Sequence, residues 1–510
     1  MKKLYLFLFI VLFCNNLYSQ LQDRIWIFGS PFSDSSNATL YFGNLSNPVV
    51  NIPNGQPNNI TVDNGSEQWA VVTNLLTGNL IFYTDGKNVF NNQNELVSNM
   101  DLGANVSSCQ PVAISPVPHL KYDNDYDLYY IFSNATGADA STFDIGTVTY
   151  RIYNATSQTF GPSNNLPGIY GTTNVTEGMK IIPCDNNHQI LWLVVSLIPD
   201  PGFERKYVVY KINKNAITYQ GNYDMGPQKM LLPSSGASTV MDITYTKANT
   251  IPGITNVGFA LQYSNAVFTC QFDNINGQFL TNTVKVCNTG YTSSIPSVYN
   301  VEFSPNGKFL YYSVYYTAGD SNELYQVDLQ NSVLTPTLVH SYGYRYAGGL
   351  KLGPDGLIYH IYDCGYSSNV LKLGRILQPD IKYIPGVTPY NQFYEESFKT
   401  YNNVFGFGLC EFLVSPTAPS GIFGTMATNT TSISIYPNPA SDIITLNVDN
   451  RNNANLTLNI YNVIGELIKS ELLKKNQQQI NISNLNNGIY IVVIKSKELT
   501  ENQKLIIQKQ

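Results

Sequence analysis

Carboxylates at or near the starts of apolar segments are the residues of this 510-residue chain best suited to chemistry. Two carboxyl groups on either side of a glycosidic bond can serve a glycosidase or a lyase as acid and base. Among Glu67, Glu177, Asp242 and Glu302, the candidate pair for that role is Glu177 and Glu302. Carboxylates are also common at turns and rims, so a structural role is the alternative.

An alternating acidic cluster, Asp123, Asp125 and Asp127, is the candidate metal site. Carboxylates at this spacing, together with backbone carbonyls, can wrap a calcium ion. The Gly and Glu that complete an EF-hand loop are missing, so a solvated hairpin turn is the favoured interpretation. We therefore expect no metal and no cofactor.

The histidines give no support to a catalytic site. There are four of them, and none has the spacing of an HExxH zinc motif, an HxH pair or a Cys-paired ligand. The sequence also contains no GxSxG elbow, Walker loop or dinucleotide fingerprint, and its Gly clusters fall where hairpin turns are expected. An enzyme is therefore the less favoured class.

Tyrosines at Tyr342, Tyr344 and Tyr346, beside Gly348 and Gly349, are the candidate ligand-binding residues. Exposed tyrosine rings can pack against the C–H faces of sugars while neighbouring amides bind the hydroxyl groups. The alternative is that these rings fill the space between packed sheets. Neighbouring tyrosines of a strand point to opposite faces, which favours packing for at least half of them.

Composition indicates an all-β protein. Only 13% of the residues are charged, whereas 43% are apolar and 13% aromatic, which excludes a disordered chain. After the N-terminus, no apolar run reaches the roughly 18 residues of a spanning helix. Residues 21–431 carry 19 basic and 29 acidic side chains, a net charge of 19 − 29 = −10, so nucleic acid is not an expected partner.

A degenerate repeat of an apolar strand, a polar turn and a Tyr- and Phe-rich strand fills the middle of the chain. Seven first strands at about 56 residues per unit predict a seven-bladed β-propeller over residues 20–414. Residues 24–29 and 40–43 look like strands that close the ring with the last repeat. The first strands are expected at residues 69–74, 111–115, 179–182, 241–245, 301–303, 350–352 and 405–412.

The turns at residues 304–307 (SPNG) and 353–356 (GPDG) resemble those of TolB-like and YVTN propellers. Residues 26–29, 78–86, 176–179 and 352–359 resemble the propeller region of large Bacteroidota surface proteins. These resemblances imply an extracellular role and supply no catalytic residues.

Residues 1–19 are typical of a secretory signal peptide, with Lys2 and Lys3 before a short apolar stretch. Export places six of the seven cysteines in a compartment that permits disulfides. Because Cys270 and Cys287 lie on flanking strands of one predicted hairpin, they are the candidate disulfide pair.

The chain changes character at a small-residue, Pro-containing linker, residues 415–431, and a second domain follows over residues 432–510. Alternating strands with Gly and Asn turns predict a small β-sandwich there. Its motifs resemble the type A sorting domain of the Bacteroidota type IX secretion system, which implies transport by that machinery and an extracellular or cell-surface location. The residues that carry the resemblance are Pro437, Asn438, Pro439, Gly465, Leu485, Gly488, Tyr490 and Lys504.

Taken together, the sequence predicts a secreted or cell-surface β-propeller that binds a protein or a glycan without catalysis. The alternative is a secreted carbohydrate-active enzyme, a glycosidase or lyase that uses inner-strand carboxylates.

Overall fold

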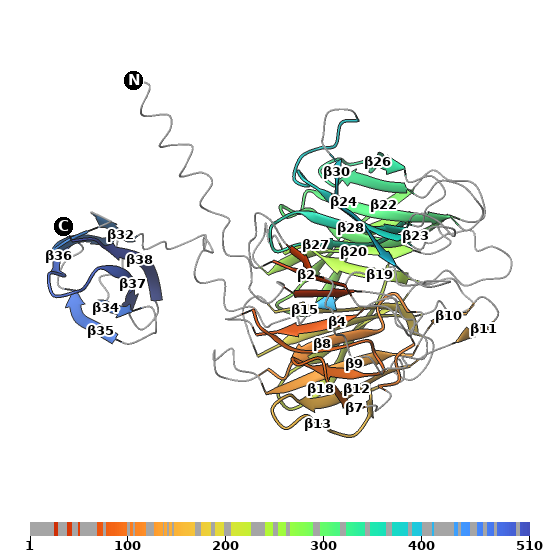
Figure 1. Ribbon diagram of the computed structural model, residues 1–510, viewed down its shortest axis with the longest axis horizontal. Coiled ribbons are helices and arrows are strands. Elements are labelled where there is room, and N and C mark those ends of the chain that lie inside the picture. The colour runs from red at the N-terminus through yellow and green to blue at the C-terminus, as the bar shows by residue number, and fades with distance from the viewer. Residues whose placement is uncertain are drawn as a thin grey trace. The chain divides into compact units, whose positions relative to one another are not determined.

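The computed structural model divides into two compact units, Met1–Thr417 and Ala418–Gln510, and each is considered by itself. All regular secondary structure among the described residues is β-strand, which confirms the all-β prediction (Figure 1). The structure describes residues 25–28, 38–42, 49–51, 69–74, 78–98, 102–105, 108–118, 127–135, 137–139, 142–144, 147–168, 175–184, 189–197, 206–225, 240–247, 253–261, 266–288, 296–316, 323–341, 347–363, 370–385, 390–399, 411–412, 433–436, 440–448, 456–462, 467–473, 477–495 and 500–509.

Four consecutive sheets of the N-terminal unit each contain four antiparallel strands joined in chain order. Their strands are β15 (Val175–Pro183), β16 (Leu191–Leu197), β17 (Lys206–Ile212) and β18 (Ile217–Asp224); β19 (Val240–Tyr245), β20 (Ile254–Leu261), β21 (Ala266–Asp273) and β22 (Gln278–Asn288); β23 (Pro296–Phe303), β24 (Phe309–Tyr316), β25 (Glu323–Asp328) and β26 (Pro336–Ser341); and β27 (Ala347–Leu352), β28 (Ile358–Asp363), β29 (Val370–Ile376) and β30 (Tyr390–Lys399).

The earlier part of the same unit forms three further sheets and a small hairpin. They are built from β1 (Ile25–Phe28), β2 (Ala38–Tyr41) and β3 (Val49–Asn51); β4 (Ala70–Thr73), β5 (Leu80–Thr84), β6 (Val89–Asn91) and β7 (Leu96–Ser98), joined by β31 (Glu411–Phe412); β8 (Val112–Pro116), β9 (Leu128–Asn134), β12 (Val148–Asn154), β13 (Thr159–Phe160) and β14 (Asn164–Asn165); and the hairpin of β10 (Gly137–Asp139) and β11 (Thr142–Asp144).

The first strands of successive sheets lie next to one another. β4 contacts β8, β8 contacts β15, and the series continues through β19 and β23 to β27. Each sheet therefore presents its first strand to the next sheet's first strand and carries its last strand outward, which is the arrangement of a β-propeller. The number of blades stays a prediction.

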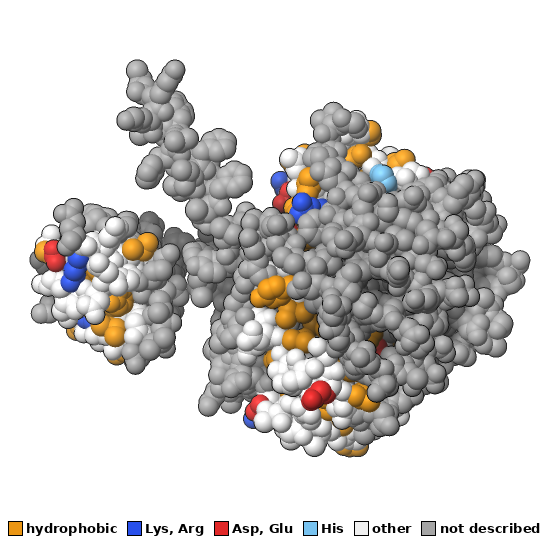
Figure 2. Space-filling view, viewed as in Figure 1, with side chains coloured by type: hydrophobic (Ala, Val, Ile, Leu, Met, Phe, Trp, Pro, Cys, Tyr) orange, Lys and Arg blue, Asp and Glu red, His pale blue; other side chains and the backbone are white. Residues whose placement is uncertain are grey.

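The buried fraction of residues falls from the inner to the outer strands of a sheet, and the strand sequences become more polar in the same direction. Every residue of β16 (LWLVVSL) is buried because neighbouring sheets cover both of its faces. β18 (ITYQGNYD) has only its first residue buried. Sheets packed in this way need apolar and aromatic side chains on both faces, so few positions remain for charged residues. Charged side chains are accordingly sparse on the described surface in Figure 2.

The N-terminal strands β1 and β2 fill the space between the first and last sheets of the series. Trp26 and Phe42 pack with Tyr359 of β28, and they belong to the same buried cluster as Trp69, which directly precedes β4. Strands lie at Ile25–Phe28 and Ala38–Tyr41, close to the predicted segments, but they pair with each other rather than with the last repeat. Of the predicted last strand, residues 405–412, only β31 is described, and it pairs in parallel with β4 rather than with β1.

Tight turns join the first and second strands of two sheets, as the SPNG and GPDG motifs predict. Gly307 and Gly356 have φ values of 69° and 80°. Their N–H groups donate to the carbonyls of Ser304 and Gly353 at 2.9 and 3.0 Å. Glycine is favoured here because a Cβ atom strains this left-handed backbone.

The predicted pairing of Cys270 with Cys287 is wrong, and neither thiol belongs to a disulfide. Cys287 of β22 lies opposite Val267, whereas Cys270 of β21 is three residues further along that strand. Successive side chains of a strand alternate between the two faces, so the two thiols point to opposite sides of the sheet. Accordingly, they belong to two different buried clusters.

The C-terminal unit is a small β-sandwich, as predicted. One sheet contains β32 (Ile433–Tyr436), β33 (Ile443–Val448) and β36 (Gln477–Asn481), and the other contains β35 (Leu467–Leu473), β34 (Leu456–Asn462), β37 (Gly488–Lys495) and β38 (Thr500–Ile507). Ile444 and Leu446 of the first sheet pack with Leu458, Ile460 and Val492 of the second. Across the described parts of both units, no helix has the length and apolarity needed to cross a membrane.

Candidate functional site

The carboxylates proposed for catalysis lie on first strands and accept backbone hydrogen bonds. Glu177 of β15 is buried, and its Oε2 accepts the N–H of Cys109 at 2.7 Å. Cys109 precedes β8, the first strand of the neighbouring sheet, so this carboxylate ties two sheets together near their inner edges.

Glu302 of β23 connects three neighbouring first strands. Its Oε1 accepts the N–H of Phe303 at 2.9 Å and the hydroxyl of Thr244 of β19 at 3.2 Å. Its Oε2 accepts the N–H of Leu352 of β27 at 3.1 Å. Both oxygens of this buried carboxylate are therefore engaged with protein donors.

Asp242 of β19 and Asn300 of β23 make the same kind of hydrogen bond, from a side-chain oxygen of one first strand to a backbone N–H of the next. The sequence alone does not identify these two residues as a pair. Asp242 Oδ2 accepts the N–H of Val301 at 3.0 Å, and Asn300 Oδ1 accepts the N–H of Leu350 at 2.7 Å. Each acceptor directly follows a register shift in the pairing of its strand. No sequence signal singles out these two positions, because β23 also carries Glu302 and β19 also carries Thr244.

A buried amide completes this set. Gln110 Oε1 accepts the N–H groups of Met179 and Ile243 at 2.9 and 3.0 Å, while its Nε2 donates to the carbonyl of Ile243. First strands are sheet edges, and their outward N–H groups need acceptors when buried. The polar side chains of the neighbouring first strands supply these acceptors.

His360 is the fully buried histidine of the described residues. Burial lowers the pKa of its imidazole to about 3, assisted by the charge of His340. The ring is neutral at pH 7 and lies inside the stack of sheets, in agreement with a structural role.

The predicted tyrosine site lies outside the described residues, and so do Asp123 and Asp125. Asp127 is described and exposed, and its Oδ1 accepts the hydroxyl of Thr156 at 2.6 Å. This bond belongs to the end of the β9–β12 hairpin, where the Asp127 carbonyl also accepts the N–H of Ala155. The described part of the acidic cluster thus takes part in hairpin contacts.

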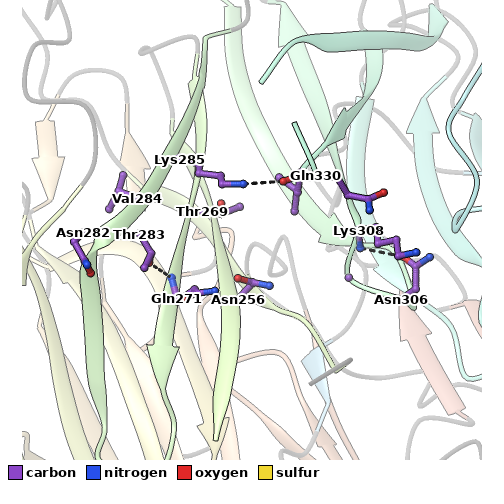
Figure 3. Close-up of a pocket in the computed structure, with 12 residues that line it drawn as sticks. Asn256, Thr269, Gln271, Asn282, Thr283, Val284, Lys285, Asn306, Lys308 and Gln330 are labelled. Carbon is purple, nitrogen blue, oxygen red and sulfur yellow. Dashed lines mark hydrogen bonds between the residues drawn. The ribbon is translucent and has the colours of Figure 1, made fainter. Parts of the chain in front are cut away.

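A polar groove of about 490 Å³ lies between the sheet β19–β22 and the sheet β23–β26 (Figure 3). We call it the polar groove. Asn282 to Lys285 of β22 stand on one side, and Asn306 and Lys308 of the β23–β24 turn stand on the other. Its described lining consists of Asn256, Thr269, Gln271, Asn282, Thr283, Val284, Lys285, Asn306, Gly307, Lys308, Leu329 and Gln330.

Local irregularities of the strands shape this groove. The register between β21 and β22 shifts between Thr269 and Gln271, and the Thr283 hydroxyl accepts the N–H of Gln271 at 2.9 Å. Across the groove, Lys285 Nζ donates to the carbonyl of Leu329 at 2.8 Å, which links the two sheets. Asn306 Oδ1 accepts the N–H of Lys308 and so fixes the opposite turn.

The charges around the polar groove are unequal. Two lysines and no acidic or aromatic residue belong to its described lining. The Asp380 carboxylate accepts the N–H of Asn306 at 2.8 Å, and although burial raises the pKa of Asp380, the charge of Lys308 partly opposes that rise. Asp328 lies 3.9 Å from Lys382. Lys285 therefore has no described carboxylate opposite it in the lining.

The predicted sorting residues of the C-terminal unit are described in part. Leu485 and Tyr490 belong to its core, and the Tyr490 hydroxyl donates to the carbonyl of Asn486 at 3.1 Å. Gly488 begins β37, and Lys504 lies in β38 opposite Ile491. Pro437, Asn438, Pro439 and Gly465 lie outside the described residues.

Comparison with known families identifies the C-terminal region. Residues 434–508 match the family described as "Secretion system C-terminal sorting domain". This match confirms the resemblance found in the sequence and implies export to the cell surface or secretion. No curated protein matches the chain.

Solved structures similar to this chain share little sequence with it. A protein from Lactobacillus plantarum is 10% identical with a TM-score of 0.42, covering 77% of this chain and 99% of its own. A GH93 α-L-arabinofuranosidase of Fusarium graminearum is 10% identical with a TM-score of 0.33, covering 66% of this chain and 87% of its own. The Bombyx mori β-fructofuranosidase is 10% identical with a TM-score of 0.29, covering 79% and 88%.

Proposed function

We propose that this protein is exported through a type IX secretion system by residues 432–510 and that its N-terminal unit is a non-catalytic glycan-binding propeller. The mature protein is then extracellular or held at the outer cell surface. The sorting domain serves transport, and binding belongs to the polar groove.

The observation that carries the binding proposal is the lining of the polar groove. Amide and hydroxyl side chains converge there from three strands and two turns, including Asn256, Gln271 and Thr283. Amides offer both donors and acceptors, as the hydroxyl groups of a sugar do. A volume of about 490 Å³ lies within the ordinary range of small-ligand sites.

The bonding of the inner carboxylates supports a non-catalytic role. A general acid or base must bring a carboxyl oxygen within hydrogen-bond reach of the substrate. Glu302 is buried and uses both oxygens on protein donors, and Glu177 is buried and bonds the neighbouring sheet. The competing hypothesis, a glycosidase or lyase using these two residues, therefore has less support than binding.

A glycan array probed with the mature protein, residues 20–510, tests the proposal. The variant Asn282→Ala/Gln330→Ala removes an exposed asparagine and an exposed glutamine from the groove. The control variant Gln93→Ala/Asn215→Ala removes an exposed glutamine and an exposed asparagine from turns of other sheets. We expect the first variant to lose glycan binding and the second to retain it. Binding that survives the first variant unchanged, or an array without any bound glycan, would contradict the proposal.

A further inference from the structure

We propose that the polar groove selects an anionic glycan, one that carries uronate carboxylates or sulfate groups along its chain. This inference rests on the proposed glycan binding and adds the charge of the ligand to it. Three properties of the groove lead to this assignment: its charge, the hydrogen bond that orients Lys285, and the absence of rings in its described lining.

The charge of the polar groove is opposite to that of the protein. The whole chain has a formal net charge of −6, yet the described lining contains Lys285 and Lys308 and no carboxylate. Counting the nearby groups, Asp380 offsets one lysine, and Asp328 is matched by Lys382. Among the described residues around the groove, one positive charge therefore remains in excess, in a chain whose formal net charge is negative.

Lys285 is held in position to bind an anion. Its ammonium donates to the carbonyl of Leu329 at 2.8 Å, which fixes the long side chain across the groove. An ammonium group has three N–H donors, so two remain for a ligand. Because the lysine is already oriented, a bound carboxylate or sulfate pays less of the entropy of ordering the side chain.

The composition of the lining indicates that the groove distinguishes sugars by their charge. Neutral sugars gain much of their affinity by stacking on aromatic rings, and none of the 12 residues drawn around the groove is aromatic (Figure 3). Amides such as Asn282 and Gln271 can bind hydroxyl groups of any sugar. The lysines add a charge-assisted bond that only an anionic sugar can accept.

Isothermal titration of the mature protein with three tetrasaccharides of similar length tests this inference. The probes are tetragalacturonate, a sulfated galactan tetrasaccharide and neutral galactotetraose, each at low and high salt. The charge variant is Lys285→Met/Lys308→Met, which keeps most of each aliphatic stem. The matched control, Lys87→Met/Lys214→Met, removes the same charge from turns of other sheets.

We expect at least one anionic tetrasaccharide to bind roughly tenfold more tightly than galactotetraose at low salt. This preference should shrink as salt screens the charges. The charge variant should lose it, and the control should keep it. Whichever anionic probe binds more tightly identifies the acidic group.

Each other outcome contradicts a stated claim. Equal binding of galactotetraose and the anionic probes would overturn the charge selection and leave the proposed glycan binding intact. Equal losses in the charge variant and the control would also overturn it, because the effect would then come from overall charge. Binding of none of the three probes, together with an empty glycan array, would overturn both proposals.

Discussion

The indole ring of Trp26 packs edge-on against the phenol ring of Tyr359, with ring centroids 5.1 Å apart. These residues are more than 300 positions apart in the sequence, in β1 and β28. Phe42 contacts both rings, at 5.0 and 5.4 Å. The contact joins the start of the N-terminal unit to the last sheet of its series, so β1 and β2 lie where the two ends of the stack meet.

Truncation of Trp26 is expected to destabilise the N-terminal unit. Trp26 is fully buried, and Trp26→Ala should lower its free energy of unfolding by about 3 to 5 kcal/mol. Denaturant unfolding followed by fluorescence measures this change. Tyr41→Ala removes an exposed ring from the adjacent strand and should cost much less. Similar losses in the two variants would show that the Trp26 contact does not hold the ends together.

Asp242 is expected to stabilise the inner strands because its side-chain oxygen accepts a hydrogen bond, and its negative charge should matter less. Asp242→Ala leaves the buried N–H of Val301 without its acceptor and should lower the free energy of unfolding by about 1 to 3 kcal/mol. Asp242→Asn keeps an oxygen there, as Asn300 does at the equivalent position of β23, and should lose less. Equal destabilisation by both variants in urea melts would refute the acceptor role.

The buried thiols of β21 and β22 are expected to be unreactive in the folded protein. Burial raises the pKa of Cys270 to about 11 and that of Cys287 to about 12, from 9.0. Both pKa values are raised on folding, so this contribution to stability is complete below pH 9 and is lost as the pH rises through 11 to 12. Thiol labelling at pH 8 should modify both cysteines only after denaturation. A peptide map showing a Cys270–Cys287 bridge would contradict the structure.

Removal of residues 432–510 is expected to prevent export across the outer membrane without unfolding the N-terminal unit. The two units are separate in the structure, and the sorting match falls within the deleted part. Fractionation followed by immunoblotting should find the truncated protein in the periplasm. Efficient release into the medium would contradict the role of this region. A silent control, the full chain with Asn215→Ala, should be exported normally.

The sequence predicts those features that depend on local patterns. The sorting domain carries motifs over about 80 residues, and the apolar strands around residues 301–312 and 350–359 flank turns that favour glycine. The role of Asp242 and Glu302 could not be read in the same way, because their bonding partners lie on another sheet, 50 or more positions away. The sequence spacing of Cys270 and Cys287 also could not reveal the register shift between β21 and β22, or that the two thiols point to opposite faces of the sheet.

The polar groove is the clearest case of a site that no sequence pattern predicts. Its lining comes from separate segments of β20, β21, β22, the β23–β24 turn and the turn after β25. Asn, Gln and Thr are abundant throughout this chain, so none of these residues stands out singly. Only the packing of two sheets brings Lys285 and Lys308 to the same groove. The aromatic candidates drew attention because tyrosine is a recognisable sugar platform, whereas amides are not.

Hydrogen exchange of the mature protein, with and without the glycan that binds most tightly, tests the central claim most directly. If the N-terminal unit binds glycan in the polar groove, amides of β22, of the β23–β24 turn and of residues 328–331 should gain protection, while β16, β28 and the C-terminal unit should not change. Protection confined to another part of the N-terminal unit, or spread over the C-terminal unit, would contradict the account.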